Sequence, residues 1–158
     1  MKRFALFQIL VSFILLMVAS VTGHAQPIMI EKSKQAIHRT ATVIQAAHSA
    51  TVTGQVFTGN LKQAVLHQQY AVQLFSDGKY IKAVHHTRRA RELARTQIEA
   101  NQGTTPAGFE ASSDEPLDGI SPAAEELDAA LSASLLNKTT EDEKAMTTKP
   151  LTGIDINE

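Results

Sequence analysis

The sequence predicts an all-α protein, with a small three-helix body over residues 26–102 and a flexible acidic tail over 103–158 that carries one short helix. Trp is absent and aromatic residues make up only 5% of the chain. Alanine, in contrast, is abundant. This composition favours close-packed helices over a sheet of β-branched and aromatic residues. Apolar residues recur with a helical period through the body. The charge changes sign after Gln102, from ten Lys and Arg against four acids to three Lys against twelve acids.

The first 25 residues have the pattern of a cleavable secretory signal peptide. Lys2 and Arg3 form a basic start, residues 4–21 are almost wholly apolar, and Gly23 and Ala25 are small residues that signal peptidase can accept. An uncleaved anchor is the alternative, because about 18 apolar residues can just cross a bilayer. We expect cleavage before Gln26, no membrane span afterwards, and a periplasmic or secreted location. The junction is typical of a Gram-negative envelope protein.

The first helix of the body is predicted over residues 27 to about 51. Ile30, Ile37 and Ile44 recur at heptad spacing, which places them on one apolar face. Gly54 interrupts this pattern, so a connection to the next helix is expected there.

A helical hairpin is predicted next, over residues 60–101. Asn60 is a candidate N-cap for a helix that runs to about Ser76, and Gly78 supplies the positive φ that ends it. The third helix then runs over 79–101. The second helix is apolar on two opposite sides, so we expect it to lie between the first and the third.

The acidic tail begins with a linker over residues 103–119, rich in Gly, Pro, Ser and acids. Ser121-Pro122 resembles an N-cap followed by proline at the first helical position, which predicts a short helix over 122–136. Its apolar stripe is Leu127, Leu131 and Leu135. Residues 139–158 are polar and are predicted to be disordered.

Residues 60–95 resemble one tetratricopeptide (TPR) repeat. The matching positions are Ala71, Leu74, Gly78, Tyr80, Ala83 and Ala90. Three positions depart from the family's pattern, namely His67, Thr87 and Arg95, and no second copy occurs about 34 residues away on either side. The resemblance implies a hairpin used for protein contacts, with small residues where the helices cross, Gly78 closing the turn and Tyr80 wedged between the helices.

The chemistry-bearing residues favour neither an enzyme nor a cofactor protein. The chain has no cysteine, no GxSxG motif and no Gly-rich phosphate loop. Its six histidines show no HxxxH or HExxH spacing, and zinc needs three or four convergent ligands. We therefore predict no catalytic, cofactor or metal site. Convergence through the fold remains open for His38, His48, His67 and His85.

The basic stretch from Lys79 to Arg95 is the candidate interaction surface. Its expected partner-binding residues are Lys79, Lys82, His86 and Arg89, which we place opposite the apolar face of the third helix. A solvated helix face is the alternative. The stretch lacks the interleaved aromatic residues of single-strand nucleic-acid binders, so a protein, a peptide or an anionic envelope surface is the expected partner.

These observations predict an exported helical interaction or scaffold module of the cell envelope. The alternative is a small periplasmic ligand- or metal-binding protein that uses the body histidines. Because body and tail carry opposite net charge, we also expect the tail to associate weakly with the basic stretch.

Overall fold

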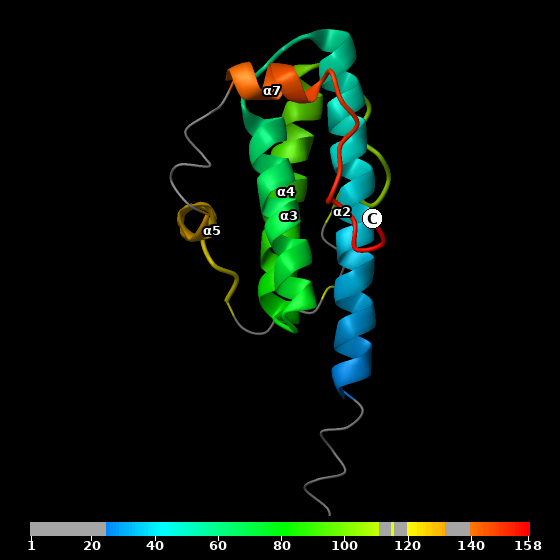
Figure 1. The fold of residues 1–158 in the computed structure, drawn as a ribbon, viewed down its shortest axis with the longest axis vertical. Coiled ribbons are helices and arrows are strands. Elements are labelled where there is room, and N and C mark those ends of the chain that lie inside the picture. Colours follow the sequence, from blue (N-terminus) through cyan, green and yellow to red (C-terminus); the bar gives the residue numbers. More distant parts are fainter. Residues whose placement is uncertain (1–24, 111–114, 116–119, 132–139) are drawn as a thin grey trace, which may run out of the picture. The chain divides into compact units, whose positions relative to one another are not determined.

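Every regular element of the described chain is an α-helix (Figure 1). The computed structural model describes residues 25–110, 115, 120–131 and 140–158, so the predicted signal peptide lies almost wholly outside the described residues. The helices are α2 (Ala25–Gly54), α3 (Asn60–Ser76), α4 (Tyr80–Ala100), α5 (Ala124–Ala130) and α7 (Thr140–Met146). The predicted all-α class, with three packed helices and a short helix after them, is confirmed.

The chain divides into two compact units, Met1–Glu31 and Lys32–Glu158. In the first unit the structure describes only the start of α2, and the second contains all the other described elements. None of the helices in the described part of the chain is both long and apolar enough to pass through a lipid bilayer.

A tight turn joins α3 and α4 into the predicted hairpin. Lys79 N–H donates to Leu74 C=O at 2.8 Å, and Gly78 N–H donates to Phe75 C=O at 3.0 Å. This pair of bonds is the Schellman ending of a helix, which requires a left-handed residue. Gly78 supplies it with φ +75°, at no steric cost because glycine has no Cβ.

The core is formed where α2 packs against this hairpin. Ile44 of α2, Leu61 of α3 and Ile98 of α4 are all fully buried in one apolar cluster. Small residues from the same helices, among them Ala47, Ala64 and Ala94, fill the remaining positions. An interior of aliphatic and small side chains explains how a chain without Trp forms a core.

The start of α3 differs from the sequence expectation. Asn60 is the first helical residue and not the cap, and the preceding Gly59 has a left-handed backbone with no side chain to accept a hydrogen bond. The cap comes instead from Glu143 of α7, whose carboxylate accepts Gly59 N–H at 2.6 Å and Leu61 N–H at 2.8 Å. A buried carboxylate satisfies free N–H groups at a helix start and also complements the helix dipole.

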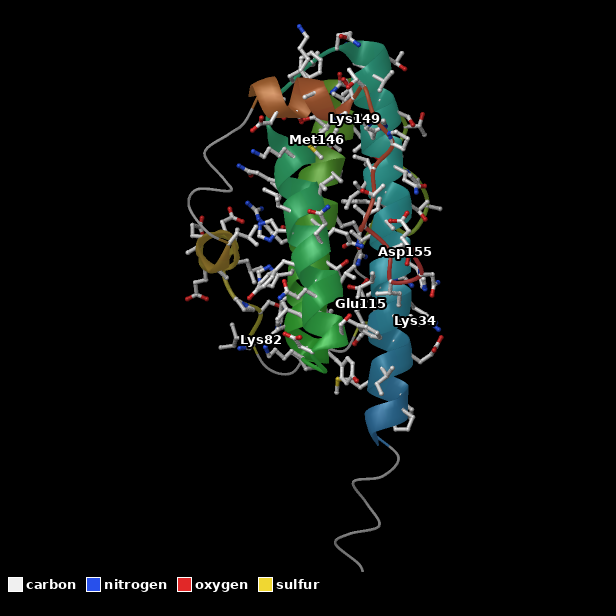
Figure 2. The ribbon with its side chains drawn as sticks, in the orientation of Figure 1. Lys34, Lys82, Glu115, Met146, Lys149 and Asp155 are labelled. Carbon is white, nitrogen blue, oxygen red and sulfur yellow. The ribbon has the colours of Figure 1, made fainter. Side chains whose placement is uncertain are left out.

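The C-terminal segment, residues 147–158, packs along α2 and α3, where we had predicted disorder. Figure 2 shows Met146 at the end of α7, and Lys149 and Asp155 along this segment beside α2. Ile154 is fully buried in the main cluster, and Ile156 packs on the cluster of Ile37, Leu74 and Ala83. The segment is polar in composition, but three of its apolar side chains, Leu151, Ile154 and Ile156, pack on the core.

Candidate functional site

The four predicted partner-binding residues separate into an exposed pair and a covered pair. Lys79 and Lys82 are exposed, and Lys79 makes a 3.0 Å ion pair with Asp77. His86 is only 4% exposed, and Arg89 is half-buried. Our placement of these four residues together opposite the apolar face of the third helix is therefore corrected for the second pair, because the acidic tail covers this part of α4.

The six hairpin residues lie mainly inside the body. Gly78 forms the turn, and the half-buried ring of Tyr80 meets the edge of Phe75, with centroids 5.3 Å apart. The remaining four are buried: Ala71, Leu74, Ala83 and Ala90.

Arg89 binds a carboxylate of the tail side-on. Its Nε donates to Asp128 Oδ1 at 2.9 Å, and its Nη2 donates to Asp128 Oδ2 at 2.8 Å. This two-bond geometry is the favoured mode for a guanidinium and a carboxylate. Hydrogen bonding to Asp128 raises the pKa of Arg89. Burial acts to raise the pKa of Asp128, but its bonds to Arg89 and His67 outweigh burial and lower the pKa overall.

A second tail carboxylate, Glu115, occupies arginines on another side of α4. Arg91 Nη2 donates to Glu115 Oε1 at 2.6 Å, and both side chains are only 2% exposed. Arg39 Nη1 lies 3.2 Å from the same oxygen, and Arg88 Nε lies 3.6 Å from Oε2. Burial lowers the pKa of Arg91, and the charge and hydrogen bond of Glu115 act in the opposite direction. Three guanidinium groups therefore converge on one carboxylate.

An open cavity of 320 Å³ lies beside this cluster. It is lined by four residues of α4, three of them arginines, and by two residues of the tail, namely Arg88, Arg91, Glu92, Arg95, Phe109 and Glu110. The Arg95 guanidinium lies over the Phe109 ring, 4.8 Å from its centroid. Arg95 Nε is buried, and no group in the described residues hydrogen-bonds to it. The cavity thus offers guanidinium groups beside an aromatic surface.

A buried histidine pair links the hairpin to Asp128. His67 Nδ1 lies 3.0 Å from His86 Nδ1, and His67 Nε2 lies 3.0 Å from Asp128 Oδ1. Tyr70 packs its ring against His86 at a centroid distance of 4.7 Å. Of the other three body histidines, His85 is buried on α4 next to His86, His38 pairs with Asp155 at 2.5 Å, and His48 Nε2 lies 3.2 Å from Met146 C=O.

Sequence reasoning did not find the pairs that join α4 and His67 to the carboxylates of the tail. Arg91, Asp128 and Glu115 were not among the predicted site residues, and His67 was named only as a histidine that the fold could bring near others. Each gains its role from a residue at least 19 positions away. The one usable signal was the opposite net charge of body and tail. No group of three His, Asp or Glu side chains in the described ranges is arranged to hold a metal ion.

Comparison with known proteins gives no relative from which a function could be transferred. No family model, curated protein or solved structure matches this chain.

Proposed function

We propose that this chain is a helical protein-interaction module of the cell envelope, exported by its N-terminal signal, and that α4 binds acidic segments of partner proteins. The observation that carries the proposal is the occupation of two arginines of α4 by carboxylates of the chain's own tail, Asp128 on Arg89 and Glu115 on Arg91. The tail thus occupies α4 as an acidic partner would. The resemblance of residues 60–95 to a TPR repeat, a hairpin used for protein contacts, supports the same proposal.

The two contacts differ in how readily a partner could replace them. The Arg91–Glu115 pair is almost fully buried, and removing one partner from a buried ion pair typically costs about 3–5 kcal/mol. In the Arg89–Asp128 pair the side chains are 19% and 30% exposed, and pairs near the surface typically contribute about 0–1 kcal/mol. We therefore assign Asp128 and α5 to the exchangeable contact and Glu115 to the fixed one.

Exchange is governed by the tether between tail and body. A flexible connection gives a bound segment an effective concentration of about millimolar, so a free competitor must overcome that concentration. A partner segment with acidic and apolar residues in the arrangement of α5 would displace α5 if the dissociation constant of that segment is well below millimolar. The exposed Lys82 lies on the same helix and the exposed Lys79 immediately precedes it, and both would add attraction for such a segment.

A labelled peptide with the sequence of residues 120–136 tests this proposal in the full-length protein. Asp128→Asn removes the charge that occupies Arg89, so we expect the peptide to bind this variant more tightly than the parent in fluorescence anisotropy at low salt. Adding Arg89→Gln to Asp128→Asn should abolish the gain. Half-molar salt should weaken the binding, because the Debye length falls to a few ångström.

The matched control is Asp142→Asn. Asp142 is also an acid of the tail paired with a base of the body, at 2.8 Å from Lys62, but that base lies on α3. This variant should bind the peptide no better than the parent. Equal peptide affinity for the Asp128 and Asp142 variants would contradict the proposal that Arg89 is the exchangeable binding residue.

A further inference from the structure

A chain of hydrogen bonds runs from the partly exposed Asp128 through His67 to the buried His86 and ends at a second cavity. His67 is fully buried between its two partners, each 3.0 Å from one of its ring nitrogens. Both nitrogens of His67 are thus engaged. His86 uses only Nδ1, and no group in the described residues hydrogen-bonds to its Nε2.

The hydrogen-bond partners determine which nitrogen of each imidazole ring carries a proton. Asp128 is held as an anion by Arg89, and an ionised carboxylate can only accept, so His67 must carry its proton on Nε2. Burial lowers the pKa of His67, so the ring is neutral and its Nδ1 is an acceptor. His86 must therefore donate from Nδ1. Burial, followed by the nearby His67 and His85, lowers the pKa of His86 to about 4, so its Nε2 keeps a free lone pair at neutral pH.

His86 lines a cavity of 230 Å³ between the hairpin and α5. Most of the wall is apolar and is formed by Tyr70 and Leu74 of α3 and by Pro122, Leu127 and Ala130 around α5. His85, Lys82 and Glu126 also line it, and the opposite charges of Lys82 and Glu126 offset each other. An apolar pocket with a small number of placed polar groups is the usual form of a small-molecule site.

We propose that this cavity binds a small, mainly apolar molecule with one hydroxyl donor, of the phenol class, which donates a hydrogen bond to His86 Nε2. This proposal goes beyond binding of acidic segments, and its cavity is lined by α5, the helix whose Asp128 pairs with Arg89. The wall fits an aromatic or aliphatic body, and Tyr70 provides an aromatic ring already packed against His86. A neutral imidazole acceptor selects a hydroxyl donor over an anion. The facing Nδ1 atoms of His67 and His86 share one proton, so the pair presents a single free nitrogen.

The imidazole protons can be observed by ¹⁵N NMR of the full-length protein. We expect His67 to be protonated on Nε2 and His86 on Nδ1, the less common form for a free histidine. Titration with phenol should shift the His86 Nε2 resonance and the amide resonances around Leu127. Anisole, which has the same ring without the hydroxyl proton, should bind about ten-fold more weakly, because the desolvated acceptor is left unpaired.

Two variants test whether the preference for phenol over anisole depends on His86. His86→Phe keeps a ring but removes the acceptor, so phenol and anisole should then bind alike. His48→Gln, a matched change at a histidine that bonds Met146 C=O, should keep the preference for phenol. Should His86→Phe fail to fold, the comparison of phenol with anisole on the parent still shows whether the cavity selects a hydroxyl donor. The proposal is overturned if His86 carries its proton on Nε2, if phenol and anisole bind the parent equally, or if phenol shifts no resonance of the cavity.

Discussion

At the scale of single residues, this body is unusual for the polar side chains that it buries. Gln68 of α3 is fully buried, and its amide donates to Ile37 C=O at 2.9 Å and to Ile154 C=O at 2.7 Å. Thr87 Oγ1 completes the set by donating to Gln68 Oε1 at 2.6 Å. Buried polar groups are tolerated when each finds a partner. One glutamine therefore joins α2, α3, α4 and the C-terminal segment.

The buried histidines should make stability depend on pH. His86 titrates near 6.5 when unfolded and at about 4 when folded, so between these values the unfolded chain binds more protons. Its contribution is present above pH 6.5 and is lost as pH falls toward 4. We expect His86 alone to make the free energy of unfolding, measured with urea, about 2 kcal/mol lower at pH 5 than at pH 7. The lowered pKa of His67 acts in the same direction.

His86→Gln, which cannot titrate, should reduce this pH difference. Comparing the variant with the parent cancels the contribution of other groups. Among these, Glu143 acts in the opposite direction, since burial raises its pKa and outweighs the backbone bonds of Gly59 and Leu61. An unchanged pH difference in the variant would show that His86 does not resist protonation in the folded protein.

At the scale of elements, the helical hairpin depends on small residues. Ala83 of α4 is fully buried and packs with Ile37 of α2 and Leu74 of α3, so all three body helices meet around its methyl group. A larger side chain there must displace neighbours in an interior that is already closely packed. The same argument does not apply to Ala145 of α7, which is exposed.

Ala83→Leu should therefore destabilise the protein by about 1–3 kcal/mol through overpacking. Urea or thermal unfolding measures the change, and Ala145→Leu should stay within about 0.5 kcal/mol of the parent. A melting temperature within a degree of the parent for Ala83→Leu would mean that Ala83 does not lie at a tight interface.

The body helices were predictable because their signals are local. The apolar period and the turn at Gly78 predicted helices over 27–51, 60–76 and 79–101, within a few residues of the observed bounds. The short helix predicted over 122–136 is observed as α5 at 124–130, and residues 132–136 lie outside the described residues. Local pattern could not find α7 or the C-terminal packing, because Glu143 and Ile154 take their roles from residues more than 80 positions away.

The candidate site was less predictable for the same reason. His86 has a polar neighbour on each side in sequence and was assigned to the solvent face of its helix. It is buried because α5 covers it and because His67 and Tyr70 reach it from α3. The charge contrast between body and tail predicted a weak association of the two, but it could not tell which carboxylate meets which arginine or that Glu115 would be buried.

At the scale of the whole molecule, the acidic tail forms part of the folded structure. α5 contributes Asp128 to Arg89, α7 contributes Glu143 to the start of α3, and residues 147–158 contribute Ile154 to the core. Each contact pairs the tail with a different place on the body. An attachment that uses a salt bridge, a helix cap and an apolar side chain is only partly screened by salt.

A chain that ends at Lys149 should consequently be less stable than the full-length protein. It loses Ile154, whose full burial contributes about 1.5–3 kcal/mol, and leaves the amide of Gln68 without one acceptor at a further cost of about 1 kcal/mol. We expect urea unfolding to show a loss of about 3 kcal/mol. A truncated chain as stable as the parent would mean that the C-terminal segment does not belong to the core.

Two isoleucines of the tail separate core packing from a general effect of removing tail residues. Ile154 is fully buried, whereas Ile120 is 97% exposed. In the full-length protein Ile154→Ala should cost about 2–5 kcal/mol, because it leaves a cavity between α2 and α3, and Ile120→Ala should change stability by less than about 0.5 kcal/mol. Peptide binding to α4 should survive Ile154→Ala at temperatures where the variant is folded, since Arg89 lies in a different contact. Loss of peptide binding without loss of the fold would instead show that the C-terminal segment and α5 hold the body as one cooperative unit.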